Sequence, residues 1–138
     1  MSIEANKAIA QRWLESLNKR ELDVADELLA SDFVSYMPGL PEPVRGAEVF
    51  KQVTSFLWGA LPDFHHTVED VIAEGDKVAI RWTAHGTHTG ELMGIPPTGK
   101  QITITGMNIY HMASGKIVKQ WSDYDHSGMM QQLGIVLP

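Results

Sequence analysis

The main change in the spacing of the apolar residues lies near residue 60, and this change limits the folds that the chain can adopt. Before that point apolar side chains recur every three or four residues, as in Ile9, Trp13 and Leu17, which is the period of one helix face. After it they alternate with polar side chains, as in Val78 and Ile80, which is the period of a strand with one buried face. Helices followed by a run of strands predict an α+β fold, with the helices packed on one face of an antiparallel sheet.

Recognisable start and stop signals bound the expected helices. Ser2 is a typical N-cap residue, and the helix that it begins is expected to run to about Lys19. Gly59 is a typical residue at the end of a helix. Further apolar patterns predict helical segments over residues 21–30, 47–58 and 125–133.

Strands and loops account for most of the remaining chain. Strands are expected over residues 33–36, 64–73, 78–85, 101–112 and 116–123. Residues 38–46 and 91–100 are rich in proline and glycine and are expected to be loops, because proline cannot donate to a strand ladder. No repeat or linker divides the chain, so residues 1–138 are expected to form a single domain. A strongly curved sheet under three helices would form a cone, whose mouth is a natural small-molecule site.

The turn at Ser114 and Gly115 leaves two registers open for the last hairpin. A plain two-residue turn would place odd positions of one strand beside even positions of the next. A turn with a bulge at Gly115 would place odd positions of both strands on one face, and the glycine favours this register. That face would suit a ligand-lined cavity, since it would carry Met107, Ile109, His111, Lys119, Trp121 and Asp125.

Composition excludes several classes of partner and site. The chain has 11 basic and 17 acidic residues, a net charge of −6, and its basic residues are scattered singly. Nucleic acid and anionic membrane surfaces are therefore not expected as partners. The absence of cysteine excludes disulfides and thiolate metal sites. No apolar run approaches the ~20 residues of a membrane-spanning helix, and no signal-peptide pattern opens the chain, so a cytoplasmic protein is expected.

Several stretches of the sequence together resemble one known family. They are DFVSYMPG over residues 32–39, the segment 62–100 with EGDKVA, GTHTGE and IPPTGK, SGKIVKQW over 114–121, and DHSGMMQQLGIVLP over 125–138. In these stretches the chain is similar to the SnoaL-like polyketide (ester) cyclases of the NTF2-like superfamily. The resemblance implies an α+β cone that is usually paired as a homodimer and uses neither a metal nor an organic cofactor.

The resemblance also implies a chemistry and two catalytic residues. The characterised cyclases close a ring by an intramolecular aldol condensation, in which a carboxylate removes a proton next to a carbonyl. By position this base matches Asp125, and an accompanying histidine matches His111. From the residues alone Asp125 has another interpretation, as the N-cap of the last helix. Family members often carry a carboxylate, an amide or a histidine near residues 36 and 37, whereas this chain has Tyr36 and Met37.

Two function classes follow from this sequence. The favoured one is a cofactor-independent enzyme, a cyclase or a lyase- or isomerase-like relative, that acts on a small apolar or aromatic molecule. The alternative is a non-catalytic protein that binds such a molecule. In either case the residues expected to line the site are Tyr36, Met37, Trp58, Phe64, Met107, Ile109 and Trp121.

The remaining histidines and the opposite sheet face carry further expectations. His85 and His88 are three residues apart on a strand and should point to opposite faces, which disfavours a metal site. His65 and His66 are adjacent and are expected to be structural. A homodimer is expected through the face opposite His111, which would carry Ile102, Ile104, Tyr110 and Val118.

Overall fold

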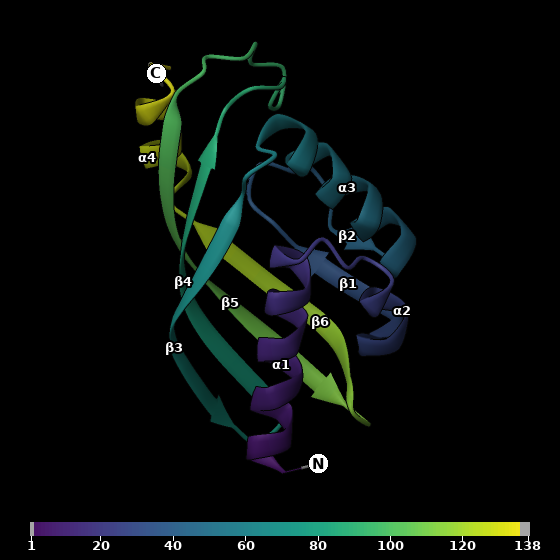
Figure 1. Ribbon diagram of the computed structural model, residues 1–138. Coiled ribbons are helices and arrows are strands. Elements are labelled where there is room, and N and C mark those ends of the chain that lie inside the picture. Colours follow the sequence, from purple (N-terminus) through teal and green to yellow (C-terminus); the bar gives the residue numbers. More distant parts are fainter. Residues whose placement is uncertain (1, 136–138) are drawn as a thin grey trace.

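The computed structural model describes residues 2–135 and follows the expected order of helices and strands, except that the expected loop over residues 38–46 contains a short strand at Val44–Arg45 (Figure 1). Ser2 caps the first helix, because its side chain accepts a hydrogen bond from the Ala5 amide. The elements are α1 (Ile3–Asn18), α2 (Val24–Leu28), β1 (Leu29–Tyr36), β2 (Val44–Arg45), α3 (Ala47–Ala60), β3 (His65–Glu74), β4 (Lys77–Thr87), β5 (Gln101–Ala113), β6 (Lys116–Tyr124) and α4 (His126–Gln132).

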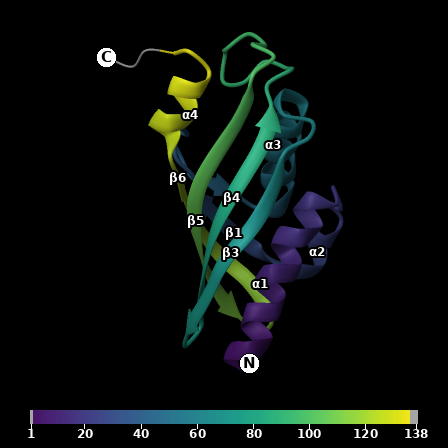
Figure 2. The same ribbon diagram turned by 60° about the vertical axis from the view of Figure 1, so that its left-hand side comes forward.

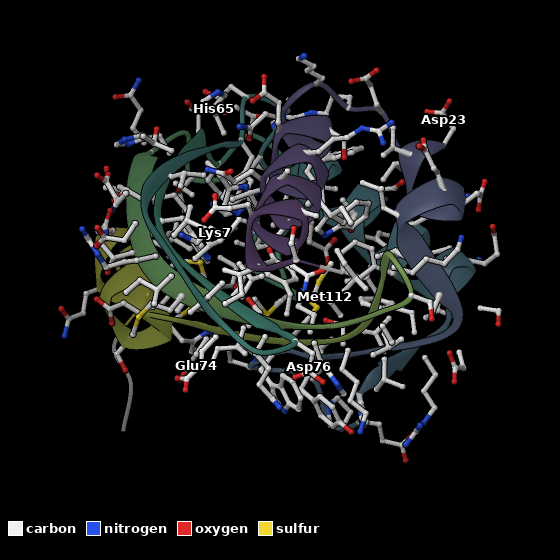
Figure 3. The ribbon with its side chains drawn as sticks, turned by 90° about the horizontal axis from the view of Figure 1, so that it is seen from below. Lys7, Asp23, His65, Glu74, Asp76 and Met112 are labelled. Carbon is white, nitrogen blue, oxygen red and sulfur yellow. The ribbon has the colours of Figure 1, made fainter. Side chains whose placement is uncertain are left out.

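The six strands form one open sheet in the order β2-β1-β6-β5-β4-β3. Helices α1 and α3 lie against the same face of this sheet (Figures 1 and 2), and the view from below shows the strands curving around α1 (Figure 3). The α+β class is therefore confirmed. The sheet is mixed rather than wholly antiparallel, because β1 pairs with β6 in parallel, with Tyr36 beside Trp121. Strand β2, helix α3 and strands β3 to β5 lie between these two strands in the chain, so no tight turn dictates their relative direction.

In the last hairpin the odd positions of β5 and β6 share a face, as expected, but the bulge that causes this lies at a different residue. Ser114 and Gly115 both have positive φ, 52° and 77°, and form a two-residue turn that pairs Ala113 with Lys116. One pair farther along, Val118 has no partner on β5, because Met112 pairs with Ile117 and His111 with Lys119. Odd positions therefore share a face, as predicted, but the bulge lies at Val118 and not at Gly115.

The predicted roles of the two sheet faces are reversed in the structure. The odd positions lie on the face without α1 and α3, where Met107, Ile109 and Trp121 are 59%, 42% and 37% exposed. The even positions face the helices, and Ile102, Ile104, Tyr110 and Met112 are buried there. We call the face with the odd positions the outer face and the face with the even positions the inner face. The expected dimer surface is wrong in its residues, since Ile102, Ile104 and Tyr110 lie in the core and Val118 is the bulge residue.

Aromatic packing between helices and strands defines which face is inner. Trp13 of α1 packs against Phe50 of α3, with ring centroids 5.6 Å apart, and Phe50 contacts Phe33 of β1 edge-on at 5.6 Å. Ser35 follows two residues later on the same face and accepts a hydrogen bond from Gln120 of β6. The inner face of β1, β6 and β5 is therefore continuous beneath the helices.

Helix α4 continues the line of β6 along the edge of β5 (Figure 2). The Asp125 amide still donates to the Thr105 carbonyl, as in a strand ladder. Farther along, the Gln132 side chain accepts from the Thr103 amide at 2.7 Å and donates to the Thr103 carbonyl at 2.8 Å. This side-chain amide satisfies the backbone groups that a longer β6 would have paired.

Candidate functional site

A group of four polar side chains lies on the inner face, at the centre of the sheet. Gln120 of β6 is the cross-strand neighbour of Ser35 on one side and of Tyr110 on the other. Asn108 follows two residues before Tyr110 on the same face of β5. All four are buried. We call Ser35, Asn108, Tyr110 and Gln120 the inner polar cluster.

The hydrogen bonds within this cluster leave two acceptors unpaired. The Asn108 amide donates to the Tyr110 hydroxyl oxygen at 2.9 Å, and the Gln120 amide donates to the Ser35 hydroxyl oxygen at 3.1 Å. Asn108 Oδ1 and Gln120 Oε1 are buried with no partner among the described residues. An unsatisfied buried acceptor costs roughly 1–3 kcal/mol, and most such groups in folded proteins are paired. Two on one face indicate a place for a molecule that donates hydrogen bonds.

Tyr110 stays neutral in this environment. Burial raises the pKa of its hydroxyl to about 12, against the smaller opposing effect of the Asn108 hydrogen bond. At neutral pH the group is a hydrogen-bond donor and acceptor and not a base.

Trp82 and His66 extend the inner face beyond the cluster. Trp82 of β4 is buried beside Gly106 of β5, and its indole Nε1 has no partner in residues 2–135. The His66 ring packs edge-on against both Phe64, at 4.9 Å, and Trp82, at 4.7 Å. The Asn18 side chain holds this position of β3, since it accepts from the His66 amide and donates to the His66 carbonyl, both at 2.8 Å.

His66 is an inward-facing imidazole that the sequence reasoning treated as structural. Burial lowers the pKa of its ring to about 4, with smaller contributions from His65 and Arg20. It is therefore neutral at pH 7. The signal that could have singled it out was its two-residue spacing from Phe64, which was already expected to line the site.

Asp125 lies at the start of α4 and caps it. Its carboxylate accepts a hydrogen bond from the Gly128 amide at 2.9 Å, and the residue is exposed. Gly128 allows this close approach, because a Cβ there would overlap Asp125 Oδ2. The N-cap interpretation therefore describes the observed contact, whereas the catalytic role stays a prediction.

His111 lies at the other end of β5. Its Nε2 is 2.9 Å from the Asp76 carboxylate, and this hydrogen bond lowers the pKa of Asp76. The Asp125 amide contacts Thr105, six residues from His111 along the strand, which corresponds to roughly 20 Å. The structure does not bring the two predicted catalytic residues together.

The predicted lining residues are divided between the two faces. Tyr36 stacks on Trp121 on the outer face, with ring centroids 5.9 Å apart and planes inclined by 11°. Met107 and Ile109 lie on the same outer face. Phe64 is buried in the core, Met37 and Trp58 are half-buried against it, and the Arg20 guanidinium lies 4.7 Å from the Trp58 ring centroid.

Neither of the two hollows that the structure describes is lined by the inner polar cluster. One, of about 460 Å³, lies between the start of α1 and the hairpin ends that carry Asp76 and Ser114 (Figure 3). The other, also of about 460 Å³, lies between α1 and the start of β3. No group of three or more His, Asp or Glu side chains in residues 2–135 is arranged to hold a metal ion. None of the described helices is long and apolar enough to cross a membrane.

Comparison with known proteins gives a consistent family match. The sequence profile described as SnoaL-like polyketide cyclase matches residues 7–133. The aklanonic acid methyl ester cyclase DauD of Streptomyces sp. (strain C5) is 28% identical over 132 residues, which cover 91% of this chain and 80% of that protein. DnrD of Streptomyces peucetius, with the same activity in its name, is also 28% identical, covering 91% and 88%.

Solved structures share both the fold and, in part, the sequence. IdmH of Streptomyces antibioticus, described as a candidate polyketide cyclase, superposes with a TM-score of 0.83 at 34% identity and covers 94% of this chain and 99% of its own. AclR of Streptomyces galilaeus, described as a candidate hydroxylase, gives 0.86 at 26% identity, covering 99% and 89%. A protein of Jannaschia sp. CCS1 gives 0.90 at 21% identity, covering 99% and 97%, and shows the shared fold alone.

We predict that His66 makes the fold sensitive to acid. Because its folded-state pKa is lowered to about 4, the unfolded chain binds a proton that the folded chain does not, between the ordinary histidine value near 6.5 and pH 4. The stability that neutral His66 contributes is present above about pH 6.5 and is lost as the pH falls towards 4. Urea unfolding at pH 7, 5.5 and 4.5 should show a smaller loss for His66→Phe than for the unmodified chain.

The adjacent His65, which is exposed, provides the matched control. His65→Phe should retain the full loss of unfolding free energy on acidification. Equal acid sensitivity in the unmodified chain and in His66→Phe would contradict the prediction.

Proposed function

The chain belongs to the SnoaL-like polyketide cyclase family, and we propose that it closes a ring on a small aromatic polyketide bound at the inner face, without a cofactor. One observation carries the location: the inner polar cluster has two buried acceptors, Asn108 Oδ1 and Gln120 Oε1, that no group in residues 2–135 satisfies. Aromatic side chains of the core adjoin the cluster, which suits a flat substrate with hydroxyl and carbonyl groups.

The proposed reaction is an intramolecular aldol condensation. A base removes a proton from a carbon next to one carbonyl, and the resulting enolate carbon attacks a second carbonyl carbon of the same molecule. A carbon–carbon bond forms, the second carbonyl becomes an alkoxide, and that oxygen takes up a proton. Neutral donors beside the enolate oxygen lower the barrier, because charge develops there in a site that excludes water.

Two residues compete for the role of base in this proposal. The resemblance assigns it to Asp125, with His111 as its partner. The position of His66 supports a second assignment, because its imidazole faces inward beside Phe64 and Trp82. Its lowered pKa of about 4 makes it a weak base at pH 7. The two are separable by mutation, since Asp125→Asn retains a good N-cap residue for α4 and removes only the basic oxygen.

We expect Asp125→Asn to lower turnover of aklanonic acid methyl ester at least ~100-fold if Asp125 is the base, with an unchanged melting temperature. That ester is the compound in the names of the curated relatives. Product formation is followed by chromatography, and His66→Gln is assayed beside it. Loss of turnover in His66→Gln alone would assign the base to His66 and contradict the Asp125 assignment.

A non-catalytic binding protein is the second candidate function. The observation that favours it is that none of the buried residues in the described part of the chain is an aspartate or a glutamate. Tight binding of the ester by the unmodified chain with no turnover at any pH between 6 and 9 would support this function and contradict the cyclase proposal.

A homodimer formed through the outer face is also part of the proposal. The strand register aligns one apolar residue from each of five strands in a single row, Ile72, Ala79, Ile109, Trp121 and Tyr36. Met107 adjoins this row, and Ile72 is 67% exposed. Rows of exposed apolar side chains on a helix-free face are typical of interfaces, and a second copy would bury them. The cytoplasmic location stays a prediction from the sequence.

We predict that Ile109→Lys converts the dimer to a monomer in sedimentation equilibrium at micromolar concentration, because it places a charge in the middle of the apolar row. Phe56 of α3 is 81% exposed and lies outside the row, so Phe56→Lys should leave the dimer intact. A monomer for the unmodified chain, or a dimer that survives Ile109→Lys, would contradict this interface.

A further inference from the structure

Trp82 presents a buried hydrogen-bond donor on the inner face that the fold itself does not use. The residue is 4% exposed, and Nε1 has no partner in the described residues. An indole N–H is a donor only, so a buried one almost always finds an acceptor. Trp13 has an unpaired Nε1 as well, but it is on α1 and packs against Phe50. The strand register places Trp82 opposite Gly106, one inward-facing position before Asn108 of the inner polar cluster.

Gly106 determines how the Trp82 indole lies. The two residues are cross-strand neighbours, and a Cβ on Gly106 would lie 2.5 Å from Cζ2 and 2.7 Å from Cη2 of the ring. The indole therefore rests directly on the glycine backbone, in space that any other residue would fill. Cζ2 is bonded to the ring carbon that carries Nε1. The part of the indole next to the N–H is thus the part that covers Gly106 of β5.

The next inward-facing residue of β5 is Asn108, whose Oδ1 is one of the two unpaired acceptors. The unpaired donor of Trp82 on β4 and the unpaired acceptor of Asn108 on β5 are therefore diagonal neighbours on the inner face, with no hydrogen bond between them. A molecule that offers a carbonyl oxygen to Trp82 and a hydroxyl to Asn108 would satisfy both. Hydroxylated aromatic ketones, and the enols derived from them, carry these two groups.

On this basis, and resting on the function proposed above, we propose that the Trp82 indole N–H binds the substrate carbonyl oxygen and stabilises the enolate that forms from it. Gly106 is the positioning residue that makes this orientation possible. When the base removes the proton next to the carbonyl, the electron pair moves onto the oxygen that the indole already contacts. The N–H keeps its proton throughout, so Trp82 acts as a hydrogen-bond donor and not as an acid.

A matched pair of ligands tests this without the natural substrate. 2-Acetylnaphthalene and 2-isopropenylnaphthalene have nearly the same shape, but only the first has a carbonyl oxygen. The unmodified chain should bind the ketone about tenfold more tightly, the value of one well-made hydrogen bond. In Trp82→Phe the preference should fall to within about twofold, because the ring remains and the donor is removed. Gly106→Ala keeps the N–H but displaces the ring, and should lose the preference as well.

Spectra of the chain with ¹⁵N-labelled tryptophan provide a readout that needs no variant at position 82. Variants of the other three tryptophans to phenylalanine assign the four indole signals by elimination. The Trp82 N–H signal should move on addition of the ketone and not of the alkene, and the signal of Trp121, on the outer face, should stay in place for both.

Four outcomes overturn the inference, and the last of them is distinguishable from the first three. Equal affinity for the two ligands, or a Trp82 signal that does not move while the ketone binds, contradicts the donor role and leaves the proposed cyclase site standing. Full retention of the ketone preference in Trp82→Phe also contradicts the donor role and leaves the proposed cyclase site standing. If neither ligand binds the unmodified chain at millimolar concentration, the aromatic-binding inner face is contradicted together with the donor role.

Discussion

The bulge at Val118 determines which side chains of β6 face the helices. Both the inner polar cluster and the apolar row on the outer face depend on it. A single skipped residue shifts the parity of the strand. With it, Gln120 joins Ser35 and Tyr110 beneath the helices, and Trp121 joins Tyr36 and Ile109 outside. Without it the indole would enter the core and the amide would face water, so one local irregularity creates both a polar inner cluster and an apolar outer row.

Each face of the sheet thus carries a feature that lowers the stability of the isolated protein, and the two features differ in kind. On the inner face, buried amide oxygens without partners lower the stability of the isolated fold, a cost that a bound hydroxyl would remove. On the outer face, Ile72, Met107 and Ile109 expose apolar surface that a second copy would cover. Ligand binding would therefore remove the cost of the unpaired acceptors, and dimer formation would remove the cost of the exposed apolar surface. The same strands carry both sites.

Sequence patterns predicted the order of the elements and most of their bounds, because period and turn chemistry are local properties. They also predicted that Ile109 and Trp121 share a face. They did not predict which face the helices cover, since isoleucines and methionines occupy both odd and even positions of β5. The parallel pairing of β1 with β6 depends on long-range geometry that no short pattern encodes. The separation of Asp125 from His111 follows instead from the register of the last hairpin, which pairs His111 with Lys119, six residues before Asp125. The two-residue period of a strand places His66 on the same face as Phe64, so the sequence could have predicted its inward orientation.

The proposed function requires the substrate to bind at the inner face. The most direct test is a crystal structure of the chain grown with aklanonic acid methyl ester. We expect electron density for the ligand against Asn108 Oδ1 and Gln120 Oε1, with the ring system next to Trp82. Density confined to the outer face, or to the hollow between α1 and the hairpin ends beside Asp76, would contradict this proposal.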